Sequence, residues 1–345
     1  MSELRQNLAS KEWVVIAPER SKKRDAIRPQ KMTNPVPKSE YESDCPFCPG
    51  NEEGFAIIER ARVEDGNGNW RLKVVDNKYK VLDSFNTCPL VPDAFEKEGI
   101  YQKLEGCGSH ELVIETEKHN MTIVDLTREE IRNIVSAYVD RYNEFRNNPN
   151  NLITLIFKNY GLLAGQTQPH SHSQIVGSRV VPLYIRSLLH EAEKHFDNYG
   201  SCVFCDVLRY EMEKESRIVY YNDNYAAFVP FAASSEHETW ILPRWHTACL
   251  SDVKDGKLDD LADILKVLLN KFNLAIDNPD FNYVFRVGPY PLSQVPFYHW
   301  HIQVLPRTKI VGGFERATRI QVNTVLPEES AKMLRECEEC EIKGL

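Results

Sequence analysis

Two stretches of the chain place apolar residues at the spacing of an amphipathic helix. The first begins at a capping box, Thr127 to Glu130, whose two side chains can each satisfy a free backbone N–H at a helix start. Apolar residues then recur every three or four positions. Both stretches predict helices packed on a sheet, and we assign their stripes to core packing. The stripes are Ile131, Ile134, Val135, Tyr138, Val139, Tyr142 and Phe145, then Leu261, Ile264, Leu265, Leu268, Phe272 and Ile276.

Each predicted helix is followed by an Asn-Pro turn and then by a short apolar run. The turns are Asn148-Pro149 and Asn278-Pro279, and the runs are residues 155–157 and 283–285. Short runs of apolar and aromatic residues bounded by turns are typical of buried strands. Further strands are predicted at residues 13–18 and 112–114.

The order of helix, turn and strand belongs to a longer internal repeat. The motif H-x-H-x-Q occurs twice, at residues 170–174 and 299–303. Side chains along a strand alternate between its two faces, so both imidazoles and the amide of each copy share one face. Three convergent polar groups of this kind predict a phosphate site.

Two further landmarks recur in the same order. A C-x-x-C motif stands at residues 45–48 and 202–205, and a His-Glu pair is followed nine residues later by a second histidine at residues 110–119 and 237–246. A fixed order of matching landmarks indicates duplication. The 345 residues suffice for two cores, and a charged helical stretch separates the repeats. We therefore predict two domains, residues 1–190 and 191–345.

The composition of the chain indicates which kind of partner it binds and in which cellular compartment it acts. The net charge of −8 is spread along the chain, which argues against nucleic acid and favours a small-molecule partner. The N-terminal residues lack the apolar core of a signal peptide, and no window approaches the roughly 18 uninterrupted apolar residues of a membrane span. We expect a cytoplasmic protein that does not associate with membranes.

The cysteines are expected to be reduced in that compartment. None of the nine is predicted to form a disulfide, and we interpret Cys88, Cys107 and Cys249 as ordinary buried thiols. A third C-x-x-C motif, at residues 337–340, lies in a charged C-terminal stretch with no histidine after it. We interpret that motif as a solvated helix end.

The cysteines and histidines of the repeats form two candidate metal sites. Two thiolates with two imidazoles suit a closed tetrahedral zinc site, whereas the alternative for a C-x-x-C pair is a redox dithiol. The Pro-Phe interior of the first pair, and its expected place in a loop, favour zinc. We predict two zinc ions per chain, the first bound by Cys45, Cys48, His119 and His170 and the second by Cys202, Cys205, His246 and His299.

The first triad also offers a nucleophile. If His170 binds a metal, His172 remains on the same face as a neutral imidazole that can attack phosphorus. Gln174 can donate its amide to a phosphoryl oxygen that gains charge in the transition state. The alternative, that both histidines are metal ligands or buried core groups, applies most to His301, because a duplicated domain need retain only one nucleophile. Two glycines within residues 158–165 would let the backbone approach a nucleotide.

These motifs resemble the galactose-1-phosphate uridylyltransferase family, a two-repeat branch of the histidine triad superfamily, over nearly the whole chain. The resemblance implies an α+β fold of two tandem histidine-triad-like repeats, each an antiparallel sheet with packed helices. It also implies a ping-pong reaction, in which a covalent nucleotidyl-histidine at His172 passes a nucleoside monophosphate from a nucleotide sugar to a sugar 1-phosphate. The matching stretches are residues 13–20, 45–48, 75–78, 110–119, 157–174, 299–307 and 312–315.

The resemblance further implies the residues that contact the substrates. The positions that match the family's contacts to base, ribose and phosphates are Arg20, Asn77, Asn159, Thr167 and Gln174. The positions that match its hexose phosphate contacts, commonly delivered by the second subunit, are Lys309, Phe314, Glu315 and Gln321. A homodimer is therefore implied.

Three departures from the family pattern leave the specificity open. Ser171 stands where the best-known members have proline, as in branches that include ADP-glucose phosphorylase, so the base is open. Residues 316–319 carry two arginines where many relatives have Gly-Thr-Gly, so the sugar is open. In some well-known members a glutamate and histidines hold the second metal, so the second cysteine site rests on internal repetition.

Four interpretations of function follow. The leading one is uridylyl transfer between UDP-glucose and galactose 1-phosphate, and its rival is an ADP-glucose phosphorylase that uses inorganic phosphate. A non-catalytic nucleotide-binding or metal-binding module is less favoured, because the first repeat keeps nucleophile, glutamine and nucleotide positions together. A dinucleotide hydrolase is less favoured because Lys309, Glu315 and Gln321 suit a sugar-phosphate acceptor.

Overall fold

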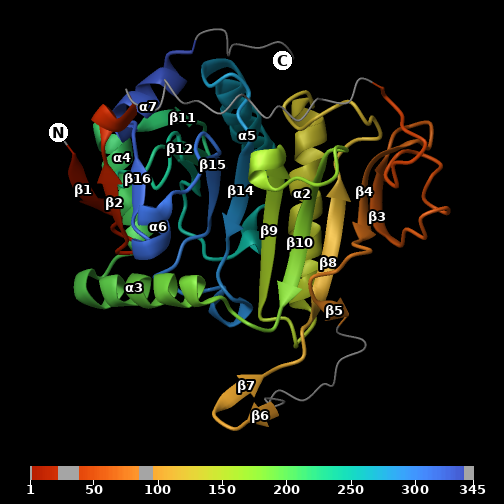
Figure 1. Ribbon diagram of the computed structural model, residues 1–345, viewed down its shortest axis with the longest axis horizontal. Helices are drawn as coiled ribbons and strands as arrows, with labels where there is room; N and C mark the ends of the chain where they lie inside the picture. The colour runs from red at the N-terminus through yellow and green to blue at the C-terminus, as the bar shows by residue number, and fades with distance from the viewer. Residues whose placement is uncertain (1, 22–38, 85–95, 338–345) are drawn as a thin grey trace.

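The centre of the molecule is one 11-stranded sheet with helices on both faces (Figure 1). The computed structural model describes residues 2–21, 39–84 and 96–337. The strands follow the order β11-β12-β13-β15-β14-β9-β10-β8-β4-β3, and the short β5 (Asp83–Ser84) pairs with β8 off this path. Apart from the parallel β5 pair, neighbouring strands of this sheet are antiparallel. The predicted α+β class is confirmed.

Each repeat contributes half of this path, in mirrored order. The first half-sheet is β3 (Glu59–Glu64), β4 (Trp70–Asp76), β8 (Cys107–Ile114), β10 (His172–Ser178) and β9 (Ile153–Tyr160). The second is β14 (Phe281–Arg286), β15 (His301–Pro306), β13 (Thr239–Pro243), β12 (Tyr225–Phe228) and β11 (Ile218–Tyr221).

The two half-sheets meet at β9 and β14, which pair from Tyr160 opposite Phe281 to Ile156 opposite Phe285. The sequence predicts a sheet for each repeat but not this junction. Each of these strands would otherwise be an edge with unpaired N–H and C=O groups, so pairing them satisfies both. The junction places the two triad strands, β10 and β15, next to the two strands that meet.

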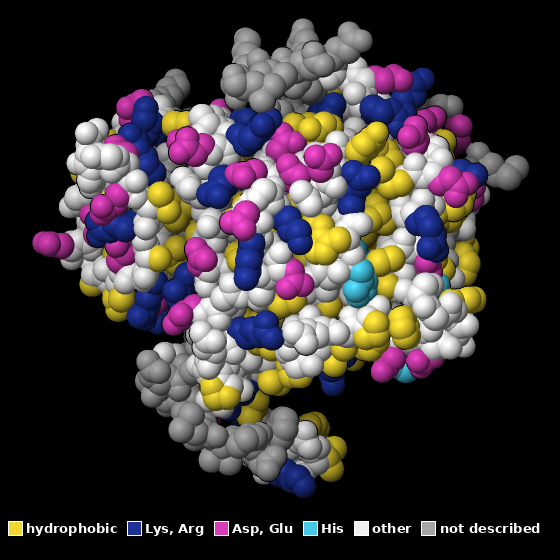
Figure 2. All heavy atoms as spheres, turned by 180° about the vertical axis from the view of Figure 1, so that it is seen from behind, with side chains coloured by type: hydrophobic (Ala, Val, Ile, Leu, Met, Phe, Trp, Pro, Cys, Tyr) yellow, Lys and Arg dark blue, Asp and Glu magenta, His cyan; other side chains and the backbone are white. Residues whose placement is uncertain are grey.

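The predicted amphipathic helices, α2 (Arg128–Arg146) and α5 (Gly256–Ala275), pack against each other and cover one face of the sheet across the junction (Figure 1). The capping box is present, with Glu130 N donating to Thr127 Oγ1 at 3.2 Å and Thr127 N to Glu130 Oε2 at 2.8 Å. All predicted core residues of α2 are buried. Seen from this side, the surface carries interspersed charges of both signs (Figure 2).

The opposite face differs between the two halves. Helices α3 (Leu183–Tyr199) and α4 (Val203–Lys214) share a core with the second half-sheet, through Phe204, Phe228 and Trp240 among others. In the first half a smaller cluster lies there, in which Phe47 packs with Leu112 and Ile114. The first triad therefore lies on the less heavily covered half of this face.

The remaining elements form smaller units. β1 (Glu3–Gln6) and β2 (Trp13–Ile16) join β16 (Gln321–Asn323) in a 3-stranded sheet in which β2 and β16 are parallel. This confirms the strand predicted near residue 13. The hairpin of β6 (Glu96–Glu98) and β7 (Tyr101–Lys103) projects from the body (Figure 1). Helices α6 (Gly313–Thr318) and α7 (Pro327–Arg335) follow near the C-terminus.

The cysteine and membrane predictions have mixed outcomes. Cys249 is a free, buried thiol as expected. The interpretation of Cys107 as a free thiol is wrong, because Cys107 is disulfide-bonded. Cys88 and Cys340 lie outside the described residues. A disulfide requires the two Cα atoms to lie within about 7 Å, a distance that a C-x-x-C search does not detect. None of the described helices is long and apolar enough to cross a membrane.

Candidate active site

The first triad places its two histidines in different roles. His170 directs Nδ1 toward Cys45 Sγ at 3.6 Å and Cys48 Sγ at 3.8 Å, and its Nε2 lies 2.8 Å from the carbonyl oxygen of Thr116. The carbonyl fixes the proton on Nε2 and leaves the Nδ1 lone pair facing the thiols. His170 is thus arranged as a metal ligand.

His172 makes different contacts from His170. Its Nδ1 lies 2.9 Å from the carbonyl oxygen of His170 and therefore carries the proton, which leaves the lone pair on Nε2. Within the described residues, Nε2 makes no hydrogen bond. Burial lowers the pKa of His172, with a further contribution from the charge of Lys158, so the ring is neutral. A neutral imidazole with a free Nε2 can act as a nucleophile.

The first predicted metal site is assembled from four buried residues, Cys45, Cys48, His119 and His170, whose ligand atoms lie within 4.8 Å of one another. Zn–S bonds of about 2.3 Å and Zn–N bonds of about 2.0 Å give tetrahedral S···N edges of about 3.5 Å. The measured edges are 3.4, 3.6 and 3.8 Å. Burial raises the pKa of the Cys45 thiol to about 12, so a bound cation would hold it as thiolate at neutral pH. The four residues fit a metal ion.

The second predicted set, Cys202, Cys205, His246 and His299, also converges within 4.8 Å. Cys205 Sγ lies 3.3 Å from His246 Nδ1 and 3.5 Å from His299 Nδ1. Unlike the first C-x-x-C, this one begins a helix, because Cys202 is the N-cap residue of α4. A hydrogen bond with Cys205 lowers the pKa of Cys202 to about 3, which favours the thiolate that a metal needs. Two converging imidazoles distinguish this arrangement from a redox dithiol.

Gln174 follows His172 on the same face of β10. His110 connects Gln174 with Asn77. His110 Nε2 lies 2.9 Å from Gln174 Oε1 and 3.1 Å from Asn77 Nδ2. The side chains of Asn77, His110 and Gln174 thus lie together. The sequence signal for His110 was the repeated His-Glu pair, to which no role was given.

The other predicted nucleotide positions make no hydrogen bond with this cluster in the part of the chain that the structure describes. Asn159, on β9, accepts a hydrogen bond from Asn282 of β14 at 2.8 Å, across the junction. Thr167 is exposed on the loop that leads to His170, and Arg20 is exposed at the end of a short 3-10 helix after β2. The structure therefore brings Asn77 and Gln174 together and leaves Arg20 and Thr167 on connecting segments.

The predicted sugar-phosphate residues form a separate group at α6 and β16. Lys309 and Glu315 are paired at 3.5 Å, and Lys309 also donates to the carbonyl oxygen of Val322. Phe314 is 51% exposed, and Gln321 begins β16. Figure 1 shows α6 and β16 over the second half of the sheet, whereas β10 lies in the first.

The second triad is packed more closely by aromatic rings than the first, in which Phe47 approaches His172 at 5.9 Å between ring centroids. The ring of His301 packs between Trp240 and Phe204, with centroid distances of 4.7 and 5.1 Å, and burial lowers its pKa to about 3. Both ends of the Gln303 amide are occupied, since Oε1 accepts from Arg286 at 2.6 Å and Nε2 donates to Glu238 at 2.7 Å. One N–H of this amide is thus committed to a carboxylate, whose negative charge would repel a phosphate at this end of the amide.

A buried ion pair lies behind the first triad, on the helix side of the sheet. Lys158 Nζ donates to Glu115 Oε2 at 2.5 Å and to the carbonyl oxygen of His172 at 3.0 Å, and both side chains are about 1% exposed. Ser171 Oγ donates to the same Glu115 oxygen at 2.6 Å. The serine between the two histidines thus belongs to a charged unit that holds the backbone of His172.

Comparison with known proteins agrees with this geometry. A family model for the N-terminal domain of galactose-1-phosphate uridyl transferase matches residues 1–182, and a model for its C-terminal domain matches residues 188–342. The chain belongs to the galactose-1-phosphate uridyl transferase family. This confirms the resemblance stated from the motifs, and with it the prediction of a nucleotidyltransferase.

Members of the family with both substrate specificities are similar to the chain. ADP-glucose phosphorylase of Arabidopsis thaliana is 33% identical, over 97% of this chain and 92% of the relative. Galactose-1-phosphate uridylyltransferase of Thermotoga maritima is 27% identical, over 98% and 99%. Among solved structures, the Arabidopsis ADP-glucose phosphorylase with bound ADP-glucose has a TM-score of 0.81 at 30% identity, covering 97% and 98% of the two chains. A uridylyltransferase structure has a TM-score of 0.75 at 25% identity, covering 99% and 100%.

The ion pair behind His172 gives a stability prediction. Lys158→Met leaves the Glu115 carboxylate buried without its cation, so we expect the free energy of unfolding in urea to fall by roughly 3–5 kcal/mol. Lys158→Met/Glu115→Met removes both charges and should recover most of that loss. Lys118→Met, which removes an exposed partner of Glu40, should change stability by less than about 1 kcal/mol. Equal stability of the single and double Lys158 variants would contradict the role of the pair.

Proposed function

We propose that the protein transfers a nucleoside monophosphate from a nucleotide sugar to a phosphate-bearing acceptor through a covalent intermediate on His172. The observation that carries this proposal is the contrast between the triads. His172 is neutral, with its Nε2 lone pair unengaged within the described residues, and it stands beside Gln174. The corresponding His301 and Gln303 are held by aromatic rings and by two charged side chains.

The reaction is a double displacement at the α-phosphorus. In the first half, His172 Nε2 forms an N–P bond and the P–O bond to the departing sugar phosphate breaks, so the electron pair leaves on an oxygen that is already part of a stable anion. In the second half, a phosphate oxygen of the acceptor forms a new P–O bond and the N–P bond breaks. Gln174 donates its amide to the non-bridging oxygen that gains charge in each transition state.

Two donors fit this chemistry. We place uridylyl transfer between UDP-glucose and galactose 1-phosphate first, because the uridyl transferase family models cover both halves of the chain. A specific observation favours ADP-glucose with inorganic phosphate as the second candidate, since the ADP-glucose phosphorylase relative has the higher identity, 33% against 27%.

The substrate contacts and the domain boundary are also proposals. We assign the nucleotide to Arg20, Asn77, Asn159, Thr167 and Gln174, and the sugar phosphate to Lys309, Phe314, Glu315 and Gln321. The domain boundary is proposed near residue 190, at α3. We further propose that the protein acts in the cytoplasm, which suits two sites that need reduced thiols.

We propose that both four-residue sites hold zinc. The S···N distances of 3.3 to 3.8 Å in the two sites support a closed tetrahedral ion. Such an ion, when bound, supplies a structural link. The residues Cys45, Cys48, His119 and His170 would hold the start of β10 in place, and His170 in turn positions the ring of His172 through its carbonyl oxygen.

The covalent intermediate can be trapped directly. Wild-type protein incubated with UDP-glucose or ADP-glucose labelled at the α-phosphorus should incorporate acid-labile label, and the donor that labels faster identifies the base. His172→Asn should abolish the label, whereas His301→Asn at the equivalent position should keep it. Label from neither donor, or equal label on wild type and His172→Asn, would overturn the proposal.

Metal content can be measured by elemental analysis. We expect about two zinc ions per chain in the wild type and about one in each of Cys48→Ser and Cys205→Ser, because a closed site loses affinity with one ligand. Chelation should lower the thermal midpoint of the wild type. A folded wild-type chain purified without metal would refute the assignment.

We also propose that the residues assigned to the sugar phosphate lie at the interface of a homodimer, which the oligomeric state tests. Ile310 and Phe314, beside the Lys309–Glu315 pair, are 70% and 51% exposed, which supports an interface with a second copy. Sedimentation should give the mass of a homodimer, and Phe314→Asp should weaken it. A monomer at micromolar concentration would contradict this proposal.

A further inference from the structure

We propose that His110 is a positioning residue that fixes the direction of the Gln174 amide, so that its N–H groups rather than its carbonyl oxygen face the reacting phosphate. This inference deepens the proposed function and rests on it. An inverted amide would present a carbonyl oxygen to a phosphoryl oxygen, which is repulsive. The direction of the amide therefore decides whether Gln174 stabilises or destabilises the transition state.

The hydrogen bonds around His110 determine which of its nitrogens carries the proton. The backbone N–H of Val81 donates to Nδ1 at 3.2 Å, so Nδ1 is an acceptor. A neutral imidazole has one N–H, and it must then be at Nε2. Nε2 lies 2.9 Å from the Gln174 side chain, so the glutamine atom that faces it is the acceptor Oε1.

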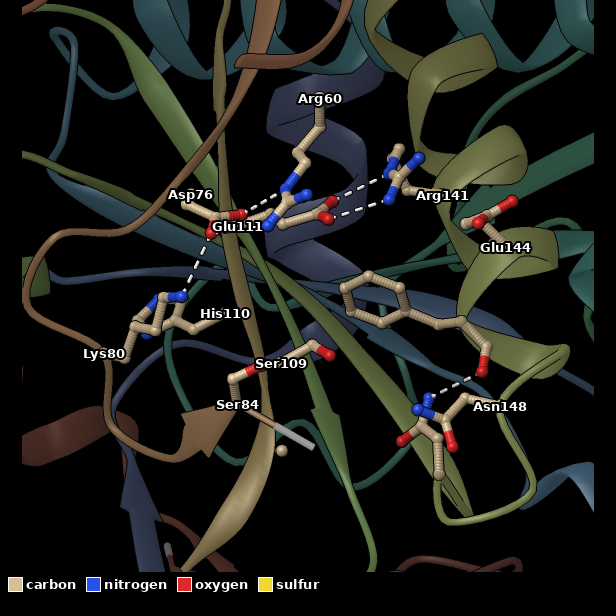
Figure 3. A pocket seen from close by; sticks show the side chains of 13 residues that line it. Arg60, Asp76, Lys80, Ser84, Ser109, His110, Glu111, Arg141, Glu144 and Asn148 are labelled. Atoms are coloured by element: carbon tan, nitrogen blue, oxygen red, sulfur yellow. Dashed lines mark hydrogen bonds and ion pairs between the residues drawn. The ribbon is translucent and has the colours of Figure 1, made fainter. Parts of the chain in front are cut away.

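The environment of His110 keeps the ring neutral. His110 is 3% exposed, and burial lowers its pKa, with the charge of Lys80 acting in the same direction. The charged groups nearby are engaged with one another, since Lys80 and Arg60 bind Asp76 while Arg141 binds Glu111 (Figure 3). Nε2 is therefore left to donate to Gln174. The Asn77 amide Nδ2, itself a donor, can give its hydrogen only to the acceptor Nδ1, 3.4 Å away.

The second repeat lacks this arrangement and serves as an internal comparison. His237, the counterpart of His110, directs Nδ1 to Ser330 Oγ at 2.8 Å instead of reaching the glutamine. Gln303 is oriented by Arg286 and Glu238, which use both ends of its amide. A neutral histidine orients a glutamine while leaving its N–H groups available, and only the first repeat has that pairing.

The tautomer can be measured in the unmodified protein. In full-length protein labelled with ¹⁵N at the histidine rings, we expect the His110 signals to show a protonated Nε2 and an unprotonated Nδ1, with His110→Gln used for assignment. A protonated Nδ1 would overturn the inference whatever the reaction proves to be.

The effect on the reaction is measured by the rate of label incorporation at saturating donor. His110→Leu removes the donor to Gln174 and should slow labelling about tenfold or more, with little change in the donor KM, because the lost interaction acts in the transition state. His110→Gln, which keeps an N–H near the same position, should recover most of the rate. His190→Leu, at an exposed histidine of α3, should behave as the wild type.

A double-mutant comparison separates positioning from a structural effect. On a Gln174→Ala background, His110→Leu should add less than about a twofold loss, because the group it orients is gone. Undiminished labelling in His110→Leu, or the full loss added to that of Gln174→Ala, would overturn the inference. Absence of label in the wild type would instead defeat the proposed function, so the two failures are distinguishable.

Discussion

The site depends on the period of two along β10. His172 and Gln174 point to the less heavily covered face of the sheet. The alternating residues, Ser171 and Ser173, point to the side of the helices. There they bond to Glu115 and to Tyr138, whose hydroxyl also meets Tyr283 of the second repeat at 2.5 Å. One face of β10 thus carries the side chains proposed to react, and the other face carries the serines that hold the strand in place. A shift of one residue in the register of β10 would exchange these two faces.

Duplication provided two such strands, and packing made them unequal. Opposite the glutamine, β8 has Leu112 where β13 has Trp240. The larger ring covers His301, and the adjacent Glu238 takes one end of the Gln303 amide. The two candidate metal-ligand sets are present in both repeats, whereas the surroundings proposed for the nucleophile are found in the first repeat. The difference arises from a few side chains opposite the triad, with the backbone order unchanged.

Much of the fold and both candidate ligand sets could be predicted from the sequence, because apolar residues recur at helical spacing and the cysteine and histidine motifs recur in both repeats. Amphipathic stripes give helices, and two cysteines with two histidines give the same chemistry in either repeat. His110, Glu115 and Lys158 were not assigned, because their roles depend on which residues lie opposite one another across β8, β9 and β10. That register is set by the folded sheet. The junction of β9 with β14 was missed for the same reason, since it joins segments that are distant in the sequence.

The parallel pairing of β2 with β16 has a consequence for how the protein is made. Residues Trp13–Ile16 hydrogen-bond with Gln321–Asn323, so β2 cannot take its place until a strand from the far end of the second repeat has been synthesised. The strands of the 11-stranded sheet all precede β16 in the chain, whereas the segment that carries Arg20 follows β2 directly and depends on that late pairing. A product that stops before β16 would therefore keep both candidate metal-ligand sets but would lack the pairing of β2 with β16.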